Sequence, residues 1–355
     1  MPRTSKKKKL TRKQRVIIAL KKPFIALRER ADVYLLRRPH RSFRVTRRRD
    51  YSRSLKLPSY IGFTKYVNTT LWKHKKIFLW LIGAYAVLTT LFVGIGSQET
   101  YTTLTSTLQD TGSEIFQGNI GQLGQAALLF VTIGSSGLTA SPAEVQQVYI
   151  VFLGLLVWLT TIWLLRNLLA GHKVKMRDGL YSAGSPIIPT LLVTLVLIVQ
   201  LIPAGLAVVG YAAANASGLL SGGVSAMLFW IAAVLLAVIS LYWITSTFFA
   251  MIIVTLPGTY PMRALKTAGD MVIGRRLRIL LRILWMMVSI SVTGAVVLIP
   301  TILINTGITH IWSGFSNVPF VPTILMLFSV TAFIWAASYI YLLYRRVVDD
   351  DAKPA

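Results

Sequence analysis

Hydrophobic residues along the chain gather into long runs that short polar stretches separate. Each of the six longest runs meets the length of about 20 residues that an α-helix needs to cross a membrane. The backbone of a spanning segment must satisfy its own hydrogen bonds, so each run predicts a transmembrane helix. The predicted spans are residues 77–96, 146–169, 187–211, 224–254, 279–304 and 321–344. The expected fold is all-α, a polytopic membrane helical bundle with interfacial helices at its cytoplasmic surface.

Lys and Arg divide the polar stretches into two kinds. Three connections contain neither residue: 97–144, 212–223 and 305–320. Outside the amino-terminal region, the basic residues lie in the connections that alternate with these, namely 170–186, 255–278 and the tail after Tyr344, except Arg166 and Arg282 at the ends of predicted helices. Because cytoplasmic loops retain Lys and Arg, the pattern predicts that both termini are cytoplasmic. A bacterial cytoplasmic (inner) membrane is the expected location.

Residues 115–138 are moderately apolar, rich in Gly and short for a span. A crossing there would carry Arg166 and the basic residues of 170–186 to the outer side, against the bias that orients the chain. We therefore predict a segment that lies at the outer surface or re-enters the membrane from it. The sequence leaves these two alternatives open.

Composition separates a charged tail from an apolar body. The 355 residues are 54% hydrophobic with a mean hydropathy of +0.61, yet their formal net charge is +26. Residues 1–76 hold 25 of the 38 Lys and Arg. We expect a basic cytoplasmic tail over 1–76, partly disordered with short amphipathic helices, a membrane domain over 77–344 and a second tail over 345–355. The charged amino terminus does not resemble a cleaved signal peptide.

The basic tail has three interpretations. Apolar residues interleaved with the basic ones favour binding to anionic lipid, at about 1 kcal/mol per Lys or Arg near the surface. Nucleic acid or the ribosome is a rival partner for residues 1–56, because any basic cluster attracts phosphate, but it is not favoured. A topology anchor without a ligand is the third interpretation.

Short motifs recur within the membrane domain. Trp-Leu-Thr-Thr at 158–161 matches Trp-Ile-Thr-Ser at 243–246, Leu-Tyr-Ser-Ala-Gly at 180–184 matches Leu-Lys-Thr-Ala-Gly at 265–269, and Leu-Ile-Pro at 201–203 recurs at 298–300. The first two pairs share an offset of 85 residues. They predict a duplicated unit, 145–206 and 230–303, in which a helix running inward is followed by a cytoplasmic connection and a helix running outward. We call the two connections, 170–186 and 255–278, the first and the second elbow. Chance matches between two membrane hairpins are the alternative.

The second elbow is basic and amphipathic. Arg275, Arg278 and Arg282 recur at helical spacing, and leucines fill the other side. This pattern predicts a helix in the membrane interface whose Arg side chains reach the headgroups. The candidate contacts for anionic lipid or a partner are Arg263, Lys266, Arg275, Arg276, Arg278 and Arg282 in this elbow, and Lys173, Lys175 and Arg177 in the first.

No motif in the chain points to catalysis. Asp110–Ser113 spells Asp-Thr-Gly-Ser, but an aspartic protease needs two such carboxylates, so a turn is expected. The four histidines have no helical-spacing partner among themselves, and there is no cysteine, so neither a metal nor a cofactor is expected. No ionisable residue lies at a span centre. Gln200, Thr160 and Thr245 form the candidate polar site within the membrane, although helix packing accounts for such hydroxyls.

The segment Pro261–Gly269, with Arg275 to Trp285 after it, resembles a bacterial membrane-domain family. Its members stand beside glycerophosphoryl diester phosphodiesterases or alone, and the resemblance covers residues 145–344. It implies a helical membrane module. No stretch outside the membrane is long enough for the phosphodiesterase barrel of about 250 residues, so no catalytic residue carries over.

Two functions of different class follow. The first is a non-enzymatic membrane module that binds lipid, especially anionic headgroups, or a protein partner at a basic cytoplasmic face. The alternative is a transporter or lipid-moving protein that uses the interface between the two repeat units. Without a central ionisable residue, ion-coupled transport is disfavoured. A membrane enzyme comes third.

Overall fold

The computed structural model describes Glu29 and residues 57–93, 144–218, 220, 223–312 and 318–351. Two compact units divide the chain, Met1–Arg53 and Ser54–Ala355, and the helices below belong to the second. Residues 1–56 of the tail apart from Glu29, the Asp110–Ser113 motif and the segment 115–138 lie outside the described residues.

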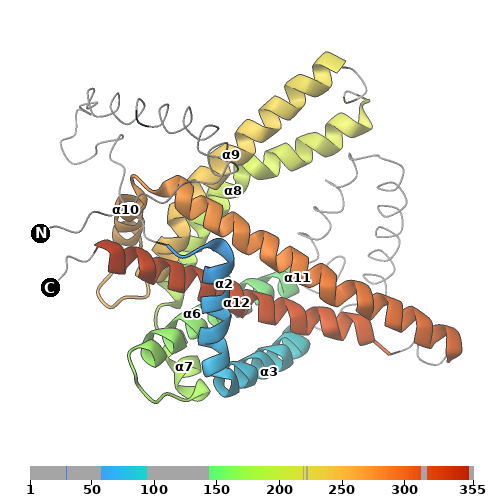
Figure 1. The fold of residues 1–355 in the computed structure, drawn as a ribbon. Helices are drawn as coiled ribbons and strands as arrows, with labels where there is room; N and C mark the ends of the chain where they lie inside the picture. The colour runs from blue at the N-terminus through green and yellow to red at the C-terminus, as the bar shows by residue number, and fades with distance from the viewer. Residues whose placement is uncertain are drawn as a thin grey trace, which may run out of the picture. The chain divides into compact units, whose positions relative to one another are not determined.

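The described residues form nine α-helices and no strand, which confirms the all-α prediction (Figure 1). They are α2 (Tyr60–Lys73), α3 (Lys75–Phe92), α6 (Glu144–Leu169), α7 (Met176–Ala183), α8 (Ile187–Ala216), α9 (Gly223–Ile253), α10 (Pro261–Val272), α11 (Arg276–Ile311) and α12 (Phe320–Asp351). Six of these, α3, α6, α8, α9, α11 and α12, are long and apolar enough to cross a membrane. The chain is a multi-pass membrane protein.

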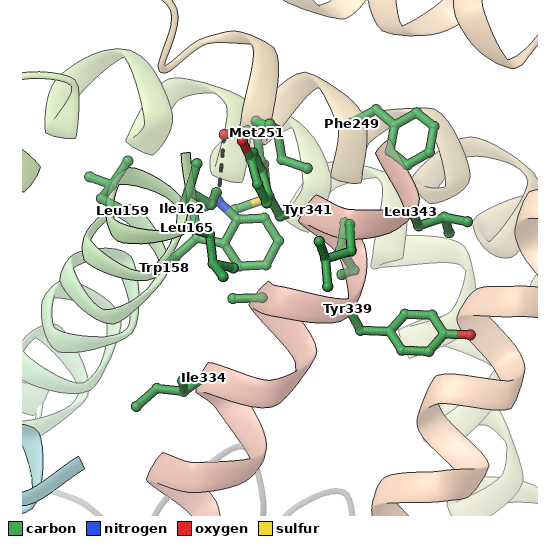
Figure 2. Packing of buried hydrophobic residues seen from close by; sticks show 14 of the residues in the cluster. Trp158, Leu159, Ile162, Leu165, Phe249, Met251, Ile334, Tyr339, Tyr341 and Leu343 are labelled. Atoms are coloured by element: carbon green, nitrogen blue, oxygen red, sulfur yellow. Dashed lines mark hydrogen bonds between the residues drawn. The ribbon is translucent and has the colours of Figure 1, made fainter. Parts of the chain in front are cut away.

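The core of the bundle forms around α12, which packs against α2, α3, α6, α9 and α11. Figure 2 shows Trp158, Ile162 and Leu165 of α6 directed toward α12. The indole of Trp158 donates to the carbonyl of Met251 in α9, with 3.5 Å between nitrogen and oxygen. A buried indole N–H requires such a partner, so this contact fixes α6 relative to α9.

Successive membrane helices alternate in direction. At one end of the bundle, Gln146 near the start of α6 donates to the carbonyl of Val93 after α3 (3.1 Å). At the other end, Arg166 near the end of α6 donates to the carbonyl of Thr255 after α9 (3.3 Å). The short helices α7 and α10 pack on α6 and α9 respectively. We call the end that carries α7, α10 and the last turns of α12 the elbow face.

The helices α8 and α9 form a hairpin whose side chains are mostly not buried against the rest of the protein. Only 6% of each of their apolar windows is buried, against 56% for α6. Pro203 lies inside α8, where a proline disrupts the helical hydrogen bonds. The next amide, Ala204, donates to the hydroxyl of Ser240 in α9 at 3.0 Å. The buried serine of α9 thus satisfies backbone at the proline within the membrane segment.

Two helix–elbow–helix units follow one another, α6–α7–α8 and α9–α10–α11. The residues that α7 buries, Gly179 and Ala183, have buried counterparts 85 positions later in Ala264 and Ala268 of α10. Thr160 of α6 and Thr245 of α9 are both fully buried at the same offset. This is the burial that the predicted repeat requires. The duplication itself stays a prediction.

Candidate functional site: the elbow face

The predicted basic contacts divide into two groups by exposure. Six of the side chains are exposed: Lys173, Lys175, Arg177, Arg263, Lys266 and Arg278. Arg275 and Arg282 are buried, and Arg276 is half-buried. The exposed group lies on or beside α7 and α10 and in the first turn of α11. The buried group holds helices together, as its contacts show.

Arg275 joins the second elbow to α12 through an ion pair. Its side chain is fully buried, and its Nη1 lies 3.3 Å from an oxygen of Asp350. Its Nε donates to the carbonyl of Met271 in the last turn of α10 (3.1 Å). Gly274 just before it has φ of 81°, a conformation that glycine favours after a helix end. The chain turns sharply here, and a buried charge receives the partner that it needs.

Arg282 holds α2 against α11. It is 8% exposed, its Nη2 donates to the carbonyl of Pro58, and its guanidinium lies 4.1 Å from the ring centre of Tyr60. One turn later, the indole of Trp285 donates to the hydroxyl of Thr64 (3.1 Å). These contacts attach α2 and the residue Pro58 before it, both within the last part of the basic tail, directly to a membrane helix.

The orientation of α11 differs from the predicted stripe. The side chains of Arg275 and Arg282 are turned into the protein, whereas Leu277 is 68% and Leu281 43% exposed. The physical reason is that a membrane helix can present its apolar side to lipid. The polar side then faces the interior, where α2 and α12 supply partners. The amphipathic helix of the second elbow is α10, which ends at Val272, before Arg275.

Arg276 joins α11 to α9. Its guanidinium lies 3.9 Å from the ring centre of Tyr242, and its Nη2 donates to the hydroxyl of Ser246 (3.4 Å). A cation over an aromatic ring contributes about 0.5–2 kcal/mol, more when water is excluded. Arg276 therefore serves helix packing as well as contributing charge to the elbow face.

The first elbow is held by fewer polar contacts. The amide of Lys175 donates to a carboxylate oxygen of Asp178 at 2.9 Å, which caps the start of α7. Gly179 packs so tightly that a Cβ there would lie 2.9 Å from Cγ of Leu164 and 3.2 Å from Cγ2 of Thr160. The exposed side chains of Lys173, Lys175 and Arg177 surround this packed face.

The candidate polar residues within the membrane take part in packing. Gln200 of α8 accepts a hydrogen bond from the hydroxyl of Thr247 in α9, with 2.5 Å between the oxygens. Thr160 shares a hydrogen bond of 2.8 Å with the hydroxyl of Tyr85 in α3. Thr245 donates to the carbonyl of Leu241 in its own helix (2.6 Å). The structure brings Gln200 and Thr160 to different helix pairs and does not form one polar site from them.

A pocket at the elbow face was missed by the sequence analysis. It has a volume of about 200 Å³ and is lined by Tyr66, Leu169, Leu342, Arg345, Arg346 and Asp349. Four of these residues belong to α12, and the other two come from α2 and α6. Only the α12 residues share a signal that a sequence carries, because they recur at helical spacing.

The described residues include no group of three His, Cys, Asp or Glu side chains that could hold a metal ion. Comparison with protein-family models, curated proteins and solved structures found no match to this chain. The resemblance to the membrane domain of the phosphodiesterase family therefore stays a prediction. The elbow face has to be interpreted from its own chemistry.

Proposed function

We propose that the protein is a non-enzymatic membrane module that binds anionic lipid headgroups through its elbow face. In this proposal the elbow face is directed to the cytoplasm of a bacterial inner membrane, and both termini lie on the same side. One observation carries the proposal: six basic side chains of the two elbows and of the adjoining turn of α11 remain exposed. The arginines beside them are held by contacts within the chain.

The electrostatics support lipid as the ligand. An anionic membrane surface attracts each nearby Lys or Arg with about 1 kcal/mol, and the attraction extends over about one Debye length. Both elbow helices pack on membrane helices through buried Gly or Ala positions. In this proposal their cations lie beside the ends of the spans, at the depth of the headgroups.

The test uses the full chain in detergent, with lipid binding followed by native mass spectrometry. The variant carries Gln at Lys173, Lys175, Arg177, Arg263, Lys266 and Arg278. We expect it to bind phosphatidylglycerol at least about tenfold more weakly than the wild type, since each 1.4 kcal/mol is a factor of ten. The control exchanges Lys and Arg at the same six positions, which keeps the charge and the binding. A Gln variant with undiminished preference for phosphatidylglycerol over phosphatidylcholine would refute the proposal.

The alternative, a transporter or lipid-moving protein that uses the interface between the two units, gains no specific support. Its candidate residue, Gln200, is engaged by Thr247 across the α8–α9 hairpin. That hydrogen bond accounts for a Gln in a membrane helix through packing alone.

A further inference from the structure

The pocket at the elbow face is lined by two leucines, a tyrosine and three charged side chains. Leu342, Arg345, Arg346 and Asp349 follow at intervals of three, one and three residues, so they share one face of α12. Leu342 and Asp349 are separated by about 10 Å along the helix axis, at 1.5 Å per residue. Leu169, at the end of α6, adds to the apolar side. A ligand here would meet apolar side chains toward the membrane and charges toward water.

The two arginines suit a phosphate. The guanidinium of Arg346 lies 4.9 Å from the ring centre of Tyr66, which restricts its orientation. Arg345, the preceding residue, is half-buried. A guanidinium offers paired N–H donors that match two oxygens of one phosphate, and part of the ordering cost is already met when it is stacked. Two such groups at one pocket favour a phosphate diester or monoester.

The carboxylate of Asp349 adds a second requirement. Within the part of the chain that the structure describes, Asp349 forms no salt bridge with Arg345 or Arg346, and the neighbouring Asp350 is the partner of Arg275. A carboxylate at a site for a purely anionic ligand would weaken binding by repulsion. It would strengthen binding of a ligand that also carries an ammonium group, because the ammonium can donate to it.

We propose that this pocket binds a headgroup that carries a phosphate and a primary ammonium, as in phosphatidylethanolamine. The phosphate contacts Arg345 and Arg346, and the ammonium donates to Asp349. Leu169 and Leu342 contact the glycerol end. This inference rests on the proposed lipid binding at the elbow face and adds to it one site and one headgroup class. Tyr66 belongs to α2, so an occupied pocket also ties α2 to α12.

The test measures binding of phosphatidylethanolamine, phosphatidylcholine and phosphatidylglycerol to the full chain in detergent by native mass spectrometry. We expect the wild type to prefer ethanolamine to choline by about fivefold or more, because the quaternary ammonium of choline has no N–H to donate to Asp349. Asp349→Asn should remove this preference and leave phosphatidylglycerol binding unchanged or stronger. Arg345→Gln with Arg346→Gln should weaken all three lipids.

A matched control is Asp270→Asn, an exposed carboxylate of α10 outside the pocket, which should keep the wild-type preference. Arg346→Lys provides a milder variant that keeps the charge but loses the paired donors. Size-exclusion profiles show whether each variant is folded. An ethanolamine preference that is absent, or that survives in Asp349→Asn, would overturn the inference while phosphatidylglycerol binding through the elbows could still stand.

The same chemistry exists in a soluble molecule, so a second arm adds glycerophosphoethanolamine as a competitor. We expect it to displace the lipid only at concentrations at least about a hundredfold higher, because it lacks the acyl chains whose burial contributes about 0.8 kcal/mol per CH₂. Displacement at equal concentration would assign the pocket to a soluble ligand and overturn the lipid source.

Discussion

The two elbows share a plan but differ in what holds them. In each, a short helix buries two small residues against the preceding span, Gly179 and Ala183 in α7 and Ala264 and Ala268 in α10. After α10, three arginines attach α11 to its neighbours. Arg275 contacts α12, Arg276 contacts α9, and Arg282 donates to the carbonyl of Pro58 just before α2. After α7, the next span begins at Ile187 without a basic residue in its first turn.

This difference teaches that positive charge has two uses at one membrane surface. In the second elbow and the start of α11, arginines form contacts that hold together helices far apart in sequence. On both elbows, the remaining cations are exposed and are the ones that the proposed lipid binding requires. A count of Lys and Arg in a loop therefore overstates the charge that lipid can meet.

The largest effect should come from breaking the ion pair between Arg275 of the second elbow and Asp350 of α12. Asp350→Asn removes the carboxylate that lies 3.3 Å from Nη1 of the buried Arg275, and removing one partner of a buried pair costs about 3 kcal/mol. We expect lower thermal stability of the purified protein, followed by circular dichroism in detergent. Asp349→Asn, at the adjacent exposed position, is the control and should change stability by about 0.5 kcal/mol or less. Equal melting curves for the two variants would contradict the claim that the ion pair between Arg275 and Asp350 stabilises the fold.

Filling the first elbow should have the next largest effect. In Gly179→Ala the new Cβ would lie 2.9 Å from Cγ of Leu164, so α7 has to shift on α6. Overpacking of this kind costs about 1–3 kcal/mol. Gly269→Ala in α10 has no atom within 4 Å of the added Cβ and should be neutral or slightly stabilising. If both variants melted together, the close packing of α7 would be refuted.

A smaller effect is expected where the two units meet. Thr247→Val removes the hydrogen bond to Gln200 that joins α9 to α8. Interhelical hydrogen bonds in membranes contribute about 0.6 kcal/mol on average and at most about 1.7. Unfolding by denaturing detergent should detect this loss. Thr293→Val in α11 is the control, because its exposed hydroxyl bonds only the carbonyl of Ser289 in the same helix.

The smallest effect lies outside both elbows, at the junction of α2 and α3. Burial and, to a lesser extent, the charge of Lys73 lower the pKa of His74 below its usual 6.5. The unfolded chain therefore binds a proton more readily than the folded one, and stability falls as pH drops below about 6.5. The melting temperature of the wild type should fall slightly more between pH 7 and pH 5 than that of His74→Gln. An identical pH dependence would show that His74 is not coupled to folding.

The sequence predicts the spans well because hydropathy acts locally. The predicted helix over 146–169 begins at Glu144, and that over 224–254 ends at Ile253. The direction of Arg282 could not be predicted, because its partner Pro58 is 224 residues away. The pocket required contact between α2, α6 and α12, and only the spacing along α12 is visible in the sequence. Non-local packing decides which polar residues are exposed.

The central claim is that both elbows lie on the cytoplasmic side of the membrane. The chain has no cysteine, so single cysteines introduced by Lys173→Cys, Met262→Cys and Ser217→Cys can be labelled without background. Each of the three positions is exposed. With a membrane-impermeant thiol reagent, we expect the Ser217 position to react in intact cells, and the Lys173 and Met262 positions only in inverted membrane vesicles. Reaction of either elbow position in intact cells would contradict the account.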